Sequence, residues 1–339
     1  MKKLLTIILI LCLLLSLALT GCSSSNPQPP AGATAPAQNS ESTAPANNEE
    51  PLKVTIGTWK TAQTITPYFY QDFSEGKLTA EVLPFTNPGD QKTALLAGSL
   101  DMCGTTIVSA ILAAANDEPV VIVAGLCNKC SALVAASGSG IESGADLKGK
   151  RIAYVPGTMH HILLLDVLRQ NNLDPDKDVT LKRIDFFDMG TALAGGEIDA
   201  FCSGEPYPTI AQLEGYGKII SYPYFDDSIG TINAAMIVTK KMAQEQPEKV
   251  QALVNAHVAA THGLNADREL WLGKAAEFGS DPAVLEAAAD NIELFYDIDE
   301  AFLAHTAKLA EEMLSLGLID KIPDIDAMFD LTFLNNAKK

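Results

Sequence analysis

Residues 146–161 read DLKGKRIAYVPGTMHH, and this stretch is the clearest indication of the fold. A turn-rich entry leads into the mainly apolar run Arg151–Val155, which predicts a strand. Pro156-Gly157-Thr158 then ends the strand, and the stretch from Met159 to Asn171 predicts a helix. A strand, a glycine turn and a helix together form the repeating unit of a parallel α/β sheet.

The same pattern recurs on both sides of this stretch. Three more strand-to-helix turns begin with glycine: Gly57-Thr58-Trp59-Lys60, Gly104-Thr105-Thr106 and Gly204-Glu205-Pro206-Tyr207. Two blocks of such units predict two α/β lobes joined by a hinge, each a mainly parallel sheet flanked by helices. We expect residues 51–135 and 236–339 to form the first lobe and residues 136–235 to form the second. The tail of the chain is expected to be nearly all helix, with a last helix starting at Asp324.

The carboxyl ends of the strands are where ligands gather in open α/β sheets, because helix N-termini there offer free N–H groups. The four glycine turns should therefore face one cleft between the lobes. The candidate ligand-binding residues are Trp59, Thr105, Thr106, Thr158, His160, Gly204, Glu205 and Tyr207. Plain structural roles stay open: Thr105 or Thr106 as a helix cap, Trp59 as a core residue, and Glu205 as a cap of the next helix.

The N-terminus has the features of an export signal. Lys2 and Lys3 precede an apolar run over 4–19, which is short for a transmembrane helix but suits a secretory signal. The sequence Leu19-Thr20-Gly21-Cys22 resembles a bacterial lipobox, in which the cysteine is acylated and the peptide is cut before it. We expect a signal peptide over 1–21 and a lipid on Cys22, with an uncleaved anchor helix as the alternative.

Residues 22–50 are rich in Ser, Pro, Ala, Asn and Gln. They lack the apolar residues needed to offset ordering entropy, so we expect a disordered linker between the membrane and the folded body. The formal net charge of −18 argues against nucleic acid as a partner. We therefore expect an extracytoplasmic, lipid-anchored monomer at the cell membrane, with a small-molecule solute as its ligand.

Cysteines offer two further hypotheses. Cys127 and Cys130 form a single CxxC, which fits a disulfide or two buried thiols. Cys103, Cys202 and His160 all fall at strand ends or helix starts, and soft S and N ligands of this kind bind Zn²⁺ or Cu(I). A metal-binding lipoprotein is therefore the alternative function.

Three segments carry a resemblance to a known family: residues 98–106 (GSLDMCGTT), 146–161 (DLKGKRIAYVPGTMHH) and 192–208 (ALAGGEIDAFCSGEPYP). The chain resembles the substrate-binding proteins of ABC importers for nitrate, sulfonates, taurine and thiamine-precursor pyrimidines, over nearly all of 51–336. His160 stands where the nitrate and bicarbonate branch has a ligand-contacting histidine, and Tyr207 stands where that branch has tryptophan.

The resemblance implies a two-lobed fold of the periplasmic binding protein-like type II. It implies hinge closure on a solute and docking onto an ABC permease with its ATPase, with no cofactor and no reaction. The sequence has no GxSxG, HExxH or Walker A motif. The family includes a pyrimidine-synthesising enzyme branch, but that branch is cytoplasmic, and an export signal does not fit it. We therefore expect a binding protein and not an enzyme.

Overall fold

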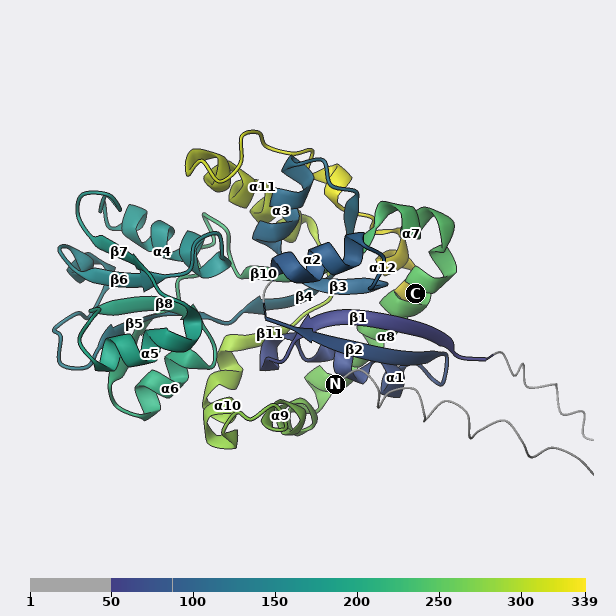
Figure 1. The fold of residues 1–339 in the computed structure, drawn as a ribbon, viewed down its shortest axis with the longest axis horizontal. Helices are drawn as coiled ribbons and strands as arrows, with labels where there is room; N and C mark the ends of the chain where they lie inside the picture. The colour runs from purple at the N-terminus through teal and green to yellow at the C-terminus, as the bar shows by residue number, and fades with distance from the viewer. Residues whose placement is uncertain (1–49, 87) are drawn as a thin grey trace, which may run out of the picture. The chain divides into compact units, whose positions relative to one another are not determined.

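The computed structural model describes residues 50–86 and 88–339. The expected signal peptide, the lipid site at Cys22 and all of the expected linker except Glu50 lie outside these residues. Within the described ranges, the chain forms two β-sheets, each covered by helices (Figure 1). We call the first sheet with its helices lobe 1, and the second sheet with its helices lobe 2. None of the described helices is both long enough and apolar enough to cross a membrane.

The sheet of lobe 1 has the strand order β11-β4-β10-β3-β1-β2. Its strands are β1 (Leu52–Trp59), β2 (Leu78–Phe85), β3 (Met102–Thr106), β4 (Val120–Lys129), β10 (Ile232–Thr239) and β11 (Ile292–Leu294). Strand β1 pairs in parallel with β2 and β3, whereas β10 pairs antiparallel with β3 and β4, and β11 antiparallel with β4. Four strands therefore run one way and two run against them.

The sheet of lobe 2 has the order β7-β6-β8-β5-β9. Its strands are β5 (Ser131–Ala136), β6 (Arg151–Tyr154), β7 (Thr180–Arg183), β8 (Ala200–Gly204) and β9 (Gly217–Ser221). Strand β6 pairs in parallel with β7 and β8, and β5 runs antiparallel to β8 and β9. The expected fold, two mainly parallel sheets flanked by helices, is confirmed.

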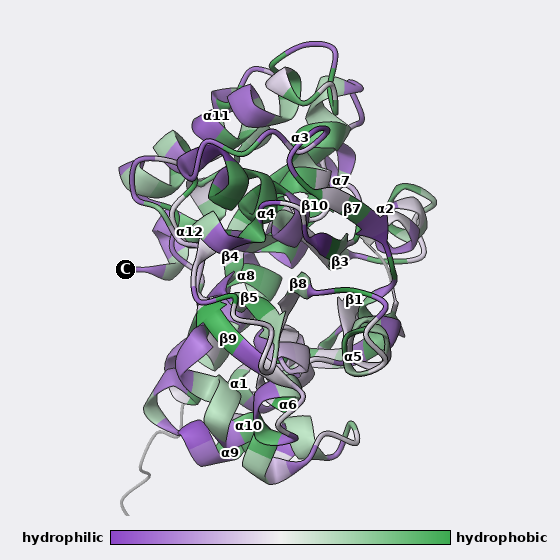
Figure 2. Ribbon diagram, turned by 90° about the vertical axis from the view of Figure 1, so that its left-hand side faces the viewer, coloured by the Kyte–Doolittle hydropathy of each residue, from purple (hydrophilic) through white to green (hydrophobic). Residues whose placement is uncertain are grey.

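Helices cover both faces of each sheet (Figure 1). Lobe 1 carries α1 (Tyr70–Phe73), α2 (Pro88–Leu96), α3 (Ile107–Ala115), α7 (Lys240–Glu245), α8 (Pro247–Ala266), α9 (Arg268–Ala276), α10 (Pro282–Ala288), α11 (Glu300–Ser315) and α12 (Thr332–Ala337). Lobe 2 carries α4 (Met159–Gln170), α5 (Phe186–Ala194) and α6 (Tyr207–Leu213). Figure 2 shows α3 hydrophobic along most of its length, whereas the outer helix α11 carries more hydrophilic residues.

The central strands β5 and β8 of lobe 2 are almost fully buried, because helices cover both faces of the sheet. Along β5, Leu133 packs in the core under α4, and Val134 packs in the core under α5 and α6. The two lobes also share apolar contacts, because Met159, Ile162 and Leu163 of α4 join the core of lobe 1. The first half of α4 therefore links the two lobes.

Three details differ from the sequence prediction. Strand β5 belongs to lobe 2, so the chain leaves lobe 1 at Cys130 and not near residue 135. Lys129 and Cys130 turn the chain with φ angles of 60° and 68°. Glycine usually occupies this left-handed region, so the two residues gave no sequence signal of the bend. The chain also returns to lobe 1 earlier than residue 236, where the sequence predicted it, because β10 of lobe 1 starts at Ile232. The helix expected at Asp324 is only a 3₁₀ turn over Asp326–Met328, and a short helix, α12, follows at Thr332.

Candidate functional site

His160 lies in the first turn of α4, where α4 meets β5 and β8. Thr158 caps this helix: its side chain accepts a hydrogen bond from the backbone N–H of His161 at 3.3 Å. The Nδ1 atom of His160 lies 2.8 Å from Ser131 Oγ, and its ring packs edge-on against Phe186. Burial lowers the pKa of His160 to about 4, so the imidazole is neutral at neutral pH.

Gly204 ends β8 directly beside this ring. A Cβ atom at position 204 would stand 2.9 Å from both Cε1 and Nε2 of His160. Only glycine leaves room for the imidazole at this distance, because real Cβ atoms do not approach other heavy atoms so closely. The glycine of this turn therefore has a steric role that fits the predicted site.

Glu205 is almost fully buried at the start of α6 and connects the two lobes. Its carboxylate accepts hydrogen bonds from the backbone N–H of Thr209 at 3.2 Å and from Asn291 Nδ2 of lobe 1 at 3.1 Å. Its backbone oxygen accepts a hydrogen bond from Gln63 Nε2 of lobe 1 at 3.3 Å. Burial raises the pKa of this carboxyl group. The expected alternative role as a cap of α6 is therefore present together with contacts to lobe 1.

The remaining candidates divide between the two lobes. Trp59 is half-buried, and its ring lies beside Gly104, where an added Cβ would be 3.3 Å from Cζ3. Thr106 caps α3, accepting a hydrogen bond from Ser109 N at 3.1 Å. Thr105 is fully buried, and its hydroxyl has no hydrogen-bond partner among the described residues. In lobe 2, Tyr207 packs edge-on against Phe187, an aromatic side chain that is 74% exposed.

The structure brings His160, Gly204 and Glu205 together, and on lobe 1 it places Trp59 beside Gly104, next to Thr105 and Thr106. Three other residues that the sequence did not single out complete the first group: Ser131, Tyr224 and Asn291. Tyr224 Oη accepts a hydrogen bond from Ser131 N at 2.7 Å and lies 2.7 Å from Asn291 Oδ1. These three residues are far apart in the sequence and follow no motif, so no local signal marks them.

The metal hypothesis is not supported by the placement of its residues. Cys103 packs in the core of lobe 1 and Cys202 in the core of lobe 2. Across residues 50–86 and 88–339, no group of three or more His, Cys, Asp or Glu side chains is arranged to hold a metal ion. Cys127 and Cys130 are buried free thiols, so the expected disulfide alternative is not formed.

Two surface cavities lie in lobe 1, away from His160. One, of about 350 Å³, includes Asp117 and Lys321 in its lining; the other, of about 420 Å³, includes Asp101 and Lys249. In each cavity these charges neutralise one another, at 2.8 Å and 2.6 Å respectively. Neither cavity is lined by the candidate residues, and neither presents these charges to a ligand unpaired.

The family model described as NMT1/THI5 like matches residues 72–267, more than half of the chain. The chain belongs to this family. Its fold is similar to that of the periplasmic aliphatic sulphonate binding protein SsuA from Escherichia coli, with a TM-score of 0.73 at 22% identity over 83% of this chain and 92% of SsuA. The periplasmic nitrate-binding protein NrtA from Synechocystis PCC 6803 gives a TM-score of 0.70 at 16% identity over 85% of this chain and 88% of NrtA.

Curated relatives align over shorter stretches. The bicarbonate transport ATP-binding protein CmpC from Synechocystis is 41% identical over 66 residues, 20% of this chain and 10% of that protein. The 4-amino-5-hydroxymethyl-2-methylpyrimidine phosphate synthase of Schizosaccharomyces pombe is 30% identical over 199 residues, 55% of this chain and 56% of the enzyme. The chain therefore spans less than two thirds of the length of these two relatives, of which one is a transport protein and the other an enzyme.

Proposed function

We propose that this protein is the solute-binding component of an ABC importer, which captures a small solute between its lobes and delivers it to a membrane permease and its ATPase. The observation that carries the proposal is the junction of the two lobes, where His160, Gly204 and Glu205 meet at the starts of α4 and α6. Helix starts of this kind bind small polar ligands with backbone N–H groups. The sulfonate and nitrate binding stated in the names of the proteins of similar fold supports the same function.

The connections between the lobes fit a hinge. Only two described segments carry the chain from one sheet to the other, the bend at Lys129–Cys130 and the stretch 222–231 between β9 and β10. A few residues of this kind can absorb the φ and ψ changes of domain closure. Solute binding would then shift the population towards a closed form that the permease recognises.

We further propose that the chain performs no reaction on its solute. Its buried thiols are poor nucleophiles, because burial raises the pKa of Cys103, Cys127 and Cys202 to about 12. The carboxylate of Glu205 already accepts two hydrogen bonds. Incubating the protein with a solute that it binds and recovering that solute unchanged is the expected result; a modified product would contradict it.

The solute class is tested by a thermal-shift screen with nitrate, bicarbonate, taurine, alkanesulfonates and pyrimidines. A solute present at 100 times its dissociation constant stabilises the folded state by ~2.7 kcal/mol, which is a clear rise in melting temperature. Trp59→Ala and His160→Ala should each reduce the rise while leaving the protein folded. No rise with any of these solutes would contradict the proposed ligand classes.

We also propose that Cys22 carries a lipid that holds the protein on the extracytoplasmic face of the cell membrane as a monomer. A flexible linker of about 29 residues would keep the binding protein near its permease at a high effective concentration. Cell fractionation is the test, with wild type expected in the membrane fraction and Cys22→Ala in the soluble one. Equal distributions of the two proteins would contradict the lipid site.

A further inference from the structure

The two ring nitrogens of His160 have different surroundings. Nδ1 lies 2.8 Å from Ser131 Oγ. Nε2 makes no hydrogen bond with any described residue, yet it is not sealed from solvent, because the half-buried ring keeps this atom accessible. One nitrogen is therefore held by the protein, and the other is left for a ligand.

Ser131 determines which nitrogen carries the proton. Its side chain is fully buried, and His160 Nδ1 is the one hydrogen-bond partner of its hydroxyl among the described residues. If Nδ1 carried the proton, the hydroxyl proton of Ser131 would be buried without an acceptor, which costs about 1–3 kcal/mol. The hydroxyl therefore donates to Nδ1, and a neutral imidazole then has its proton on Nε2.

The backbone of Ser131 is fixed from both sides, which gives its hydroxyl a defined position. Its N–H donates to Tyr224 Oη at 2.7 Å, and its carbonyl oxygen accepts a hydrogen bond from Asn291 Nδ2 at 3.2 Å. Gly204, which pairs with Ser131 in the sheet, leaves space for the Cε1–Nε2 edge of the ring. These contacts fix the orientation of Nε2.

We propose that Ser131 is a positioning residue that holds His160 with its proton on Nε2, so that the solute must present a hydrogen-bond acceptor to this N–H. The statement about the solute rests on the proposed function, whereas the statement about the proton does not. The pKa of about 4 supports the same arrangement, because His160 then binds as a neutral donor and not as a cation. The site would select its solute by an acceptor atom rather than by net charge alone.

The proton position is tested by ¹⁵N NMR of the ligand-free, full-length protein at neutral pH, with His160→Gln used to assign the signal. A neutral imidazole with its proton on Nε2 gives two widely separated ring nitrogen shifts in a pattern distinct from the other tautomer. We expect this single pattern for wild-type His160. A proton on Nδ1, or an averaged pair of shifts, would overturn the proposal.

Ser131→Ala should remove the single-tautomer pattern and give averaged shifts, and Ser131→Thr, which keeps the hydroxyl, should restore it. The matched control is Ser203→Ala on the adjacent strand. Ser203 is equally buried, but its hydroxyl has no hydrogen-bond partner among the described residues and so makes no hydrogen bond to His160. We expect the wild-type pattern in Ser203→Ala, and unchanged shifts in Ser131→Ala would overturn the role of Ser131.

Solute selection is tested with nitrate and ethanesulfonate, both of which offer oxygen acceptors. We expect Ser131→Ala to weaken binding of whichever probe binds wild type by about tenfold, as for loss of one well-placed hydrogen bond, while Ser203→Ala binds as wild type does. Equal affinity of wild type and Ser131→Ala would overturn the requirement for an acceptor. If neither probe binds wild type, the proposed solute class and this requirement both fail, whereas the NMR result decides the proton position by itself.

Discussion

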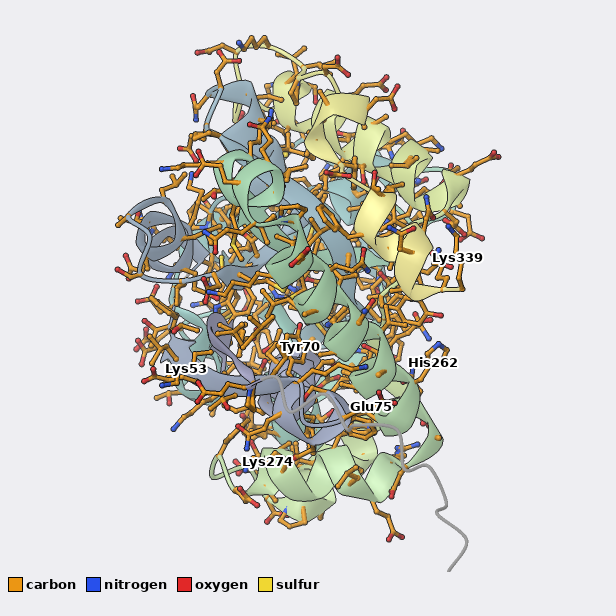
Figure 3. The ribbon with its side chains drawn as sticks, turned by 90° about the vertical axis from the view of Figure 1, so that its right-hand side faces the viewer. Lys53, Tyr70, Glu75, His262, Lys274 and Lys339 are labelled. Carbon is orange, nitrogen blue, oxygen red and sulfur yellow. The ribbon has the colours of Figure 1, made fainter. Side chains whose placement is uncertain are left out.

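His257 and His160 are two shielded histidines with the same lowered pKa of about 4 but different surroundings. In the core of lobe 1, His257 Nε2 donates to Gly125 O at 2.7 Å, and Nδ1 accepts a hydrogen bond from Tyr70 Oη at 2.8 Å. Figure 3 shows Tyr70 among the interior side chains beside α8. Both nitrogens of His257 are satisfied, whereas His160 at the lobe junction has a hydrogen-bond partner for only one nitrogen among residues 50–86 and 88–339.

Burial and a lowered pKa do not by themselves mark a functional histidine. Both rings are held neutral by desolvation. What separates them is the number of unsatisfied hydrogen-bonding atoms, because a core histidine needs two partners and a binding histidine keeps one position open. We therefore assign a structural role to His257 and a binding role to His160, and four predictions test this comparison.

The largest effect is expected from His257→Ala. This change leaves a cavity and removes the histidine partner of both the Tyr70 hydroxyl and the Gly125 carbonyl, so the free energy of unfolding should fall by about 4 kcal/mol. Urea denaturation measures it, and solute affinity of the folded variant should be unchanged. A loss of free energy of unfolding below about 1 kcal/mol would contradict the structural role of His257.

Acid should weaken the fold through His257. Its pKa is about 4 in the folded protein against 6.5 for an ordinary histidine, so below pH 6.5 the unfolded chain takes up a proton that the folded chain does not. The free energy of unfolding should therefore fall as pH drops from 6.5 to about 4, with a contribution from His257 of about 3 kcal/mol. Urea denaturation at a series of pH values measures this, and His257→Gln should give a flatter plot of the free energy of unfolding against pH. Parallel plots for wild type and variant would contradict the contribution of His257.

His160→Ala should have the opposite profile to His257→Ala. The free energy of unfolding should fall by only about 1 kcal/mol, because the ring is half-buried and makes one hydrogen bond, while solute affinity should fall at least tenfold. Isothermal titration with a solute found by the thermal-shift screen gives the affinity. A stability loss as large as that of His257→Ala, with affinity retained, would reverse the two roles.

The smallest effect is expected in the pH dependence of binding. Because His160 is neutral down to a pKa of about 4, affinity for nitrate should stay flat between about pH 5.5 and about pH 8. Nitrate does not titrate in this range, so its affinity reports the protein alone. Affinity that rises as pH falls through about 6.5 would show a cationic histidine and would contradict the neutral donor.

Local features were predictable from the sequence. Thr106 and Thr158 cap the helices that follow their glycine turns, as short polar side chains in these positions do. The apolar runs became strands of the two sheets because their residues pack under helices on both sides. His160 could be preferred to its neighbour, because adjacent helical residues face different ways, and His161 packs at a tilt against Tyr154.

Long-range features were not predictable. The hydrogen bond from Asn291 to Ser131 joins residues 160 positions apart, and that from Tyr224 to Asn291 joins residues 67 apart. No periodicity encodes such pairs, because only the finished fold brings them together. Strand β11 is three residues long, too short to show an alternation, and it lies in a part of the chain that is otherwise helical.

The strand order also determines when each lobe can be completed. The sheet strands of lobe 2 lie within one continuous stretch of chain, from Ser131 to Ser221, and these two ends meet where β5 pairs with β9. In lobe 1, β10 lies between β3 and β4, so its sheet stays split until Ile232–Thr239 has emerged. Contacts of short sequence separation form before distant ones, because they cost less loop-closure entropy. Lobe 2, which lies in the middle of the chain, should therefore fold first. The two halves of lobe 1, which precede and follow it in the sequence, should then assemble.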